Sequence, residues 1–186
     1  MERRFILVCV LILCVSSVQV LGEYHQEGKH HDLKEKVTHL HFYLHDILSG
    51  DNPSAVLVAQ SNRTSKDSKS ATPFGSVYAI DDPLTEGPEP TSKVIGNAQG
   101  TYVSTGRDKL SLVMSVDFGF MIGKFNGSSI SVLSRNPVTE GHRELAVVGG
   151  RGKFRLARGF AKLRTHYLNV TNGDAIIEYK VTVYHY

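Results

Sequence analysis

The stretch from Thr38 to Leu48 constrains the fold most strongly, because its side chains alternate with a period of two. One row is apolar except for Asp46, and the other row is rich in histidine. Such alternation is typical of a β-strand with one buried face. A carboxylate on the buried face must be paired, protonated or directed at a ligand, because burying it alone is costly. The pattern therefore leaves two roles open for Asp46, one structural and one functional.

Further strand patterns follow at short intervals and are separated by turn residues. They span residues 55–60, 74–80, 98–104, 110–120, 128–134, 143–148, 154–167 and 175–186. Asn172-Gly173 is a strong hairpin signal between the last two patterns. The proline-rich segment 81–90 is predicted to be a long loop, and no helix pattern is convincing. Closely spaced antiparallel strands predict an all-β domain, which is either a sandwich or a barrel.

The N-terminus has the features of a secretory signal peptide. A basic start at residues 1–4 precedes a short apolar run at 5–15, and small residues lead to Gly22. We therefore predict a signal peptide at 1–22, a flexible polar leader at 23–37 and one domain at 38–186. The apolar run is too short to span a bilayer comfortably, so no membrane attachment is expected after cleavage. Both cysteines, Cys9 and Cys14, lie in the predicted signal, so the mature domain must be stabilised by its core.

Other motifs fit a secreted protein and exclude several functions. Asn62, Asn126 and Asn169 each begin an N-glycosylation sequon. The net charge of +3 is too small, and the basic residues are too dispersed, to indicate nucleic-acid binding. The sequence contains neither a nucleophile-elbow motif nor a convincing metal-ligand spacing.

Polar residues recur on the apolar rows of several predicted strands. Arg143 shares a row with Leu145 and Val147, while Asn136 ends the row of strand 128–134. Tyr102 lies on a row with small residues, which leave space beside its ring. Two interpretations fit these rows. One is a buried Asp46–Arg143 ion pair that satisfies itself, and the other is an apolar pocket whose few polar groups orient an aromatic ligand.

The chain resembles the plant dirigent proteins across residues 38–186. The matching stretches are F-Y-L-H-D-I-L at 42–48, F-G-S-V-Y-A-I-D-D-P-L-T at 74–85, G-N-A-Q-G-T-Y-V-S at 96–104, V-D-F-G-F at 116–120, S-R-N-P-V at 134–138 and R-E-L-A-V-V-G-G-R-G-K-F-R-L-A-R-G at 143–159. The resemblance implies an eight-stranded antiparallel β-barrel similar to allene oxide cyclase. It also implies a glycosylated homo-oligomer, a trimer or a dimer, that is secreted to the apoplast.

Three functions follow from this resemblance. In the first, a separate laccase or peroxidase forms phenoxy radicals from a phenolic substrate such as coniferyl alcohol. The dirigent protein, without a cofactor or oxidative centre of its own, then directs stereoselective coupling towards lignans. In the second, a lyase similar to the pterocarpan synthases dehydrates an isoflavanol through a quinone methide and closes a ring. In the third, a cell-wall defence protein binds phenols without turnover.

The resemblance also suggests site residues. Asp46 falls on the acid of the family's H-D-I motif, Tyr102 on the tyrosine of A-Q-G-x-Y, and Arg143 on the arginine that opens a later strand. Asn136 stands where lignan-forming members often have an aspartate. Because an amide is neither a general acid nor a general base, this departure favours the divergent subgroup that includes pterocarpan synthases.

The expected roles follow from the chemistry of a quinone methide. Asp46 is expected to shuttle a proton, while Arg143 and Tyr102 polarise the quinone oxygen. Asn136 is expected to orient a ring substituent. Phe118 and Phe120, on the apolar row of strand 110–120, are expected to contact the substrate.

Overall fold

The computed structural model describes residues 28, 33–61 and 70–186. The predicted signal peptide, most of the leader and the sequon at Asn62 lie outside the described residues. The compact unit that contains the strands spans Leu33–Tyr186. Within the described residues, no helix has both the length and the apolar character needed to cross a membrane.

Nine strands and two short 3₁₀ helices are formed by the residues that the structure describes. The strands are β1 (Lys36–Asp46), β2 (Ala55–Ala59), β3 (Val77–Thr85), β4 (Val94–Ser104), β5 (Leu112–Phe120), β6 (Ser129–Asn136), β7 (Arg143–Arg151), β8 (Arg158–Leu168) and β9 (Ala175–His185). The 3₁₀ helices are η1 (Gly123–Phe125) and η2 (Gly152–Phe154). The predicted hairpin at Asn172-Gly173 connects β8 to β9, and Gly173 adopts the positive φ of 89° that such a turn favours.

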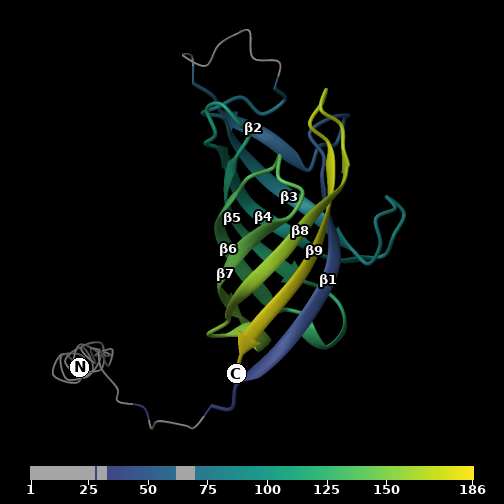
Figure 1. Cartoon of the computed structure of the whole chain (residues 1–186). Coiled ribbons are helices and arrows are strands. Elements are labelled where there is room, and N and C mark those ends of the chain that lie inside the picture. Colours follow the sequence, from purple (N-terminus) through teal and green to yellow (C-terminus); the bar gives the residue numbers. More distant parts are fainter. Residues whose placement is uncertain (1–27, 29–32, 62–69) are drawn as a thin grey trace, which may run out of the picture. The chain divides into compact units, whose positions relative to one another are not determined.

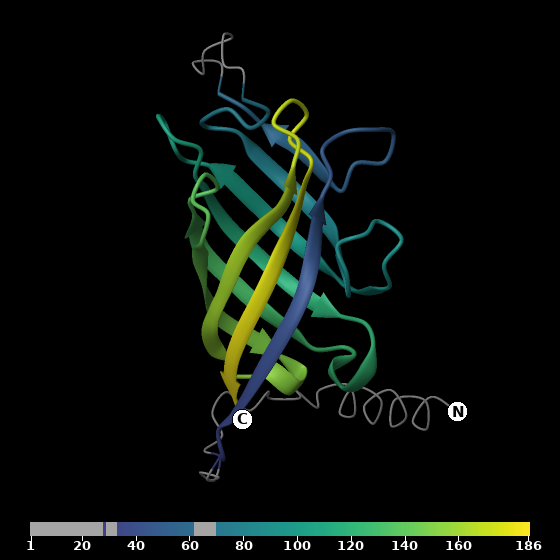
Figure 2. The same ribbon diagram turned by 45° about the vertical axis from the view of Figure 1, so that its right-hand side comes forward.

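Eight strands close into an antiparallel barrel, as Figures 1 and 2 show. Their order is β1-β9-β8-β7-β6-β5-β4-β3, and pairing of β1 with β3 at Leu44 and Leu84 completes the ring. The short strand β2 pairs only with β3, on the edge that β1 leaves uncovered. The predicted eight-stranded barrel is therefore confirmed, and the sandwich is excluded because the sheet closes on itself.

The period-two pattern of the sequence becomes the inside and the outside of the barrel. In β5, for example, Leu112, Met114 and Val116 are buried while the residues between them face outward. Aromatic rings fill one half of the interior: Phe42 contacts Phe118 edge to face, with ring centres 5.6 Å apart. The η1 and η2 helices cover this end, where their two phenylalanine rings lie 4.7 Å apart. This half of the barrel is a packed core.

Strand β3 continues further than the sequence predicted. Residues 81–85 are part of the loop predicted at 81–90 from its three prolines and one glycine, but they belong to β3 and pair with β4. The backbone N–H of Asp81 bonds to Ser54, just before β2 begins. Residues two apart in a strand direct their backbone groups to the same side. The nitrogen of Pro83 therefore faces the stretch of the β3 edge between its pairings with β2 and β1. A proline is tolerated there because no ladder hydrogen bond is lost.

Candidate functional site

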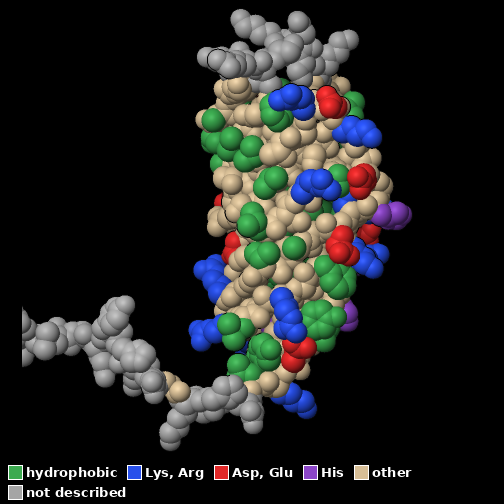
Figure 3. Space-filling view, turned by 60° about the vertical axis from the view of Figure 1, so that its left-hand side comes forward, with side chains coloured by type: hydrophobic (Ala, Val, Ile, Leu, Met, Phe, Trp, Pro, Cys, Tyr) green, Lys and Arg blue, Asp and Glu red, His purple; other side chains and the backbone are tan. Residues whose placement is uncertain are grey.

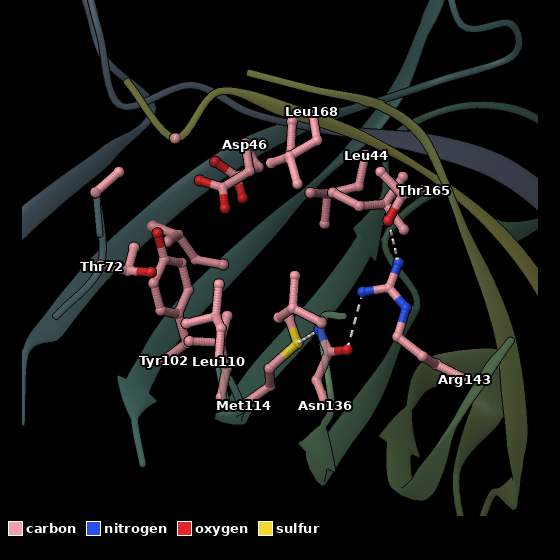
Figure 4. Close-up of a pocket in the computed structure, with 18 of the residues that line it drawn as sticks. Leu44, Asp46, Thr72, Tyr102, Leu110, Met114, Asn136, Arg143, Thr165 and Leu168 are labelled. Carbon is pink, nitrogen blue, oxygen red and sulfur yellow. Dashed lines mark hydrogen bonds between the residues drawn. The ribbon is translucent and has the colours of Figure 1, made fainter. Parts of the chain in front are cut away.

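The half of the barrel away from η1 and η2 encloses a cavity of about 270 Å³. Its wall is formed by inward side chains of the barrel strands, and its rim by residues 70–72, 168–170 and Gly173. Val170 on this rim is 74% exposed, so the cavity extends close to the surface. Figure 4 shows that polar side chains gather on two opposite sides of the cavity, with Leu44, Leu110 and Met114 between them.

One side is acidic and is built by three strands. Asp46 comes from the end of β1, Tyr102 from β4 and Asp82 from β3. Asp82 is only 1% exposed, and it lies on the inward row of β3 with Tyr78 and Ile80. Asp46 is half-buried because it faces the cavity, yet its Oδ1 atom is buried and lacks a hydrogen bond among the described residues.

Ser54 contacts Asp82 and two backbone groups. Ser54 Oγ accepts a hydrogen bond from the backbone N–H of Ile47. It donates to Asp82 Oδ1 at 2.6 Å, and the carbonyl oxygen of His45 lies further away, at 3.2 Å. The hydroxyl has a single hydrogen, so the nearer carboxyl oxygen is its main acceptor.

Burial favours the protonated form of the carboxyls on this side of the cavity. Burial raises the pKa of Asp46 to about 7, an effect that the hydroxyl of Tyr102 opposes and the charge of Asp174 reinforces. Burial and the neighbouring charge of Asp46 raise the pKa of Asp82 further, to about 9, although Ser54 opposes the shift. The two carboxyls titrate as a pair. Near neutral pH, this side of the cavity therefore holds at least one transferable proton.

Tyr102 completes the acidic side as a neutral phenol. Burial, followed by the charges of Asp46 and Asp82, raises the pKa of its hydroxyl far above the usual range. The hydroxyl lies close enough to Asp46 to stabilise the carboxylate but makes no well-aligned hydrogen bond among the described residues. Its ring stacks on Tyr78 with centres 4.9 Å apart. Tyr102 can thus offer a proton in a hydrogen bond to a ligand oxygen.

The opposite side is cationic. Arg143, from β7, is 4% exposed and donates to Asn136 Oδ1 at 3.0 Å and to Thr165 Oγ1 at 2.7 Å. Asn136 Nδ2 lies 3.2 Å from Met114 Sδ, which leaves its carbonyl oxygen for the guanidinium. Within the described residues, Arg143 forms no ion pair, so the Asp46–Arg143 pair of the structural interpretation is wrong.

The two sides come from different strands of the barrel. Tyr102 lies on β4 and Arg143 on β7, with β5 and β6 between them in the sheet. The hydroxyl of Tyr179 feels the charges of Arg143, Asp82 and Asp46. That Arg143 and Tyr102 polarise the same quinone oxygen stays a prediction.

Comparisons with known proteins identify the family to which this barrel belongs. A family model described as a dirigent-like protein matches residues 37–184. The chain belongs to the dirigent family. It is 58% identical over 157 residues to Dirigent protein 15 of Arabidopsis thaliana, with 82% of each chain covered. It is 51% identical over 154 residues to Pterocarpan synthase 1 of Glycine max, covering 82% of this chain and 81% of the relative.

A solved structure supports the same assignment. The pterocarpan synthase dirigent protein GePTS1 superposes with a TM-score of 0.77 at 46% identity, covering 84% of this chain and 89% of that one. The named relatives thus divide between dirigent proteins and pterocarpan synthases.

In this dirigent barrel, four of the six residues expected to act on the substrate line the cavity: Asp46, Tyr102, Asn136 and Arg143. Phe118 and Phe120 do not line it and pack instead in the aromatic core, so their expected contact with a substrate is not supported. The sequence also missed Asp82 and Thr165. The alternation Tyr78, Ile80, Asp82 was a signal for Asp82 that the predicted loop concealed.

Proposed function

We propose that this dirigent-family protein is a lyase that removes water from a phenolic alcohol of the isoflavanol type and closes a ring through a quinone methide. The observation that carries the proposal is the position of Asp46 and Asp82, two carboxyls of raised pKa, in the same largely apolar cavity as a buried arginine. Forming a quinone methide requires an acid at the leaving hydroxyl and a positive charge at the phenol oxygen, which lie at the two ends of the reacting molecule.

In the first step, the phenol oxygen of the substrate faces Arg143 and its alcohol faces the acid pair. The substrate reaches the site as the phenolate, with its phenol proton left in the solvent, and the oxygen lone pair forms the carbonyl while the bond from carbon to the hydroxyl breaks. Asp82, or Asp46 when it is protonated, donates a proton to the leaving hydroxyl, which departs as water. The guanidinium of Arg143 stabilises the negative charge on the phenol oxygen.

In the second step, a hydroxyl of the same molecule adds to the electrophilic carbon. Its proton passes to the carboxylate that acted in the first step, while the quinone oxygen becomes a phenolate that takes a proton from the solvent when the product leaves. The net change is the loss of one water, and the acid pair is regenerated. Tyr102 beside Asp46 orients the entering hydroxyl, and the apolar wall excludes water that would trap the intermediate.

The size of the cavity favours one substrate molecule. A volume of about 270 Å³ lies at the small end of ligand sites. The identity to a pterocarpan synthase of Glycine max supports the same reaction class.

Stereochemical guidance of radical coupling is the second proposal, favoured by the identity to Dirigent protein 15. A separate laccase or peroxidase would supply phenoxy radicals of a monolignol, and the apolar cavity would present one face of each. A phenol-binding role in wall defence without turnover is the third possibility, and the experiment below separates all three.

The test compares two incubations by chiral chromatography. With an isoflavanol and no oxidant, we expect one enantiomer of the ring-closed product in excess. With coniferyl alcohol and a one-electron oxidant, we expect coupling products that remain racemic. Enantiomerically enriched coupling together with an unchanged isoflavanol would overturn the lyase in favour of radical guidance. Binding of both phenols without any product would support the defence role.

We further propose that the protein is secreted to the apoplast after removal of residues 1–22 and that it assembles as a homo-oligomer. Asn126 is exposed in the turn after η1, and Asn169 is half-buried in the β8–β9 hairpin, so both sequons lie in turns. Intact-mass analysis of protein from plant culture medium tests the cleavage site and the glycans at Asn62, Asn126 and Asn169.

A further inference from the structure

The guanidinium of Arg143 is a buried charge with only neutral partners. It is 4% exposed, it donates to Asn136 and Thr165, and its Nε atom has no hydrogen-bond partner among the described residues. Burying a cation without a counter-charge is costly, and neutral dipoles repay only part of that cost. A bound anion would therefore supply the counter-charge that Arg143 lacks among the described residues.

The neighbours of Arg143 do not supply that charge. Asn136 from β6 and Thr165 from β8 are neutral, and Tyr179 from β9 keeps its proton because burial raises the pKa of its hydroxyl. Among the cavity carboxyls, Asp46 lies on the opposite side in Figure 4, and Asp82 is close enough to Asp46 to feel its charge. No described carboxylate lies within ion-pair distance of the guanidinium.

Asn136 occupies the position where a counter-ion would fit. Its Oδ1 atom lies 3.0 Å from Arg143 Nη1, and its side chain is 5% exposed. An aspartate there would have nearly the same shape and would bring a full negative charge to the guanidinium. The amide supplies only a dipole, so the charge of Arg143 remains available to a ligand.

We propose that Arg143, Asn136 and Thr165 form an anion subsite that binds the ligand through an ionised phenol or carboxylate oxygen, and that the neutral side chain of Asn136 sets this preference. The inference deepens the proposed function, on which it rests for the placement of a phenolic ligand in this cavity. It narrows the substrates to phenols that ionise in the site or to aromatic acids. An ionised phenol also releases a benzylic hydroxyl more readily than a neutral phenol does.

The experiment uses 4-nitrophenol, whose phenolate absorbs visible light while its neutral form does not. Titration with excess folded protein across a range of pH gives the ionisation of the bound probe. An opposite charge at close range lowers a pKa by about one to three units. We expect a lowering in that range for 4-nitrophenol bound to the wild-type protein.

Two variants make the test specific. Asn136→Asp supplies the missing counter-ion, so the bound probe should lose the shift and bind as the neutral phenol. Thr165→Val removes one neutral partner of Arg143 without adding charge, so the probe should bind more weakly but still as the phenolate. Circular dichroism confirms that each variant is folded.

A second pair of ligands distinguishes the two sources of negative charge. We expect 4-hydroxycinnamic acid to bind at least tenfold more tightly than 4-hydroxycinnamyl alcohol if the subsite takes carboxylates, and equally if it takes only phenolates. The inference is overturned if 4-nitrophenol fails to bind, if it binds as the neutral phenol, or if Asn136→Asp retains the full shift. None of these measurements involves turnover, so a failed isoflavanol assay leaves their outcome unaffected.

Discussion

Asp82 and Asp81 are adjacent residues with opposite surroundings, which makes them a matched pair for mutation. Asp82 is buried in the cavity wall, whereas Asp81 is exposed and accepts hydrogen bonds from Asn97 and Gln99 on the outer face. We expect Asp82→Asn to lower the rate of isoflavanol dehydration by about 10²- to 10⁴-fold, since an amide cannot donate the proton. Asp81→Asn should change the rate less than threefold, and equal losses in both variants would contradict the assigned role.

The same acid pair predicts how stability depends on pH. The pKa values of Asp46 and Asp82 are raised on folding to about 7 and about 9, so the folded protein binds more protons than the unfolded chain above the ordinary carboxyl pKa. Their contribution to stability is thus largest near pH 4 and declines as pH rises to about 9. The slope is at most about 1.4 kcal/mol per pH unit for each proton.

Urea unfolding at several pH values checks this dependence. The double variant Asp46→Asn with Asp82→Asn should resemble the wild-type protein near pH 4 and become relatively more stable as pH rises. A stability difference that stays constant from pH 5 to pH 9 would show that these carboxyls keep ordinary pKa values.

At the scale of single residues, the sequence showed which side chains of a strand point inward, because inward and outward side chains alternate. Alternation alone assigned Asp46, Tyr102 and Arg143 to inward rows, and the structure places all three at one cavity. This alternation does not reveal where along the barrel axis an inward residue lies. Phe118 therefore faces inward as expected but lies in the packed half and does not line the cavity.

At the scale of the element, proline caused the main error of prediction. Pro83 usually argues against a strand, but its side of β3 faces a gap between β2 and β1, so no ladder bond is lost. That gap depends on pairing between strands distant in sequence, which local patterns do not contain. Asp82 was left out of the predicted site for the same reason, because it was placed in the predicted loop and not in β3.

Two elements at the cavity rim are joined by one carboxylate. Asp174, before β9, accepts hydrogen bonds from the backbone N–H groups of Leu48 and Ser49 after β1, at 2.8 and 3.0 Å. It also accepts bonds from the side chains of Ser49 and Asn172. Burial would raise the pKa of Asp174, but these hydrogen bonds hold it below its usual range. The carboxylate thus clamps the loop after β1 to the β8–β9 hairpin.

We expect Asp174→Ala to cost about 1–3 kcal/mol, because two backbone N–H groups lose their acceptor. The midpoint of urea unfolding at pH 7 measures the loss. Asp51→Ala, an exposed change in the loop after β1, serves as the control and should stay within about 0.5 kcal/mol of the wild-type protein. Equal costs for the two variants would show that the clamp contributes nothing.

For the molecule as a whole, we propose the outer face over β5, β6 and β7 as the surface through which the proposed homo-oligomer assembles. Figure 3 shows hydrophobic side chains spread over this side of the barrel. Leu133 on β6 is 54% exposed and Val148 on β7 is 55% exposed, while Leu133 pairs across the sheet with Ser115 of β5. These two exposed apolar side chains would lose contact with water if a second copy packed on this face.

If the protein assembles through this face, Leu133→Lys should lower its oligomeric state, because a buried, unpaired charge strongly opposes association. Val58→Lys is the matched control, since Val58 is 57% exposed but lies on β2. Light scattering during size-exclusion chromatography gives the mass of each variant. We expect the Leu133 variant to elute as a monomer and the Val58 variant to elute with the wild-type oligomer. A wild-type protein that is monomeric at every concentration would contradict the homo-oligomer, whereas an oligomer that persists in both variants would place the interface on another face.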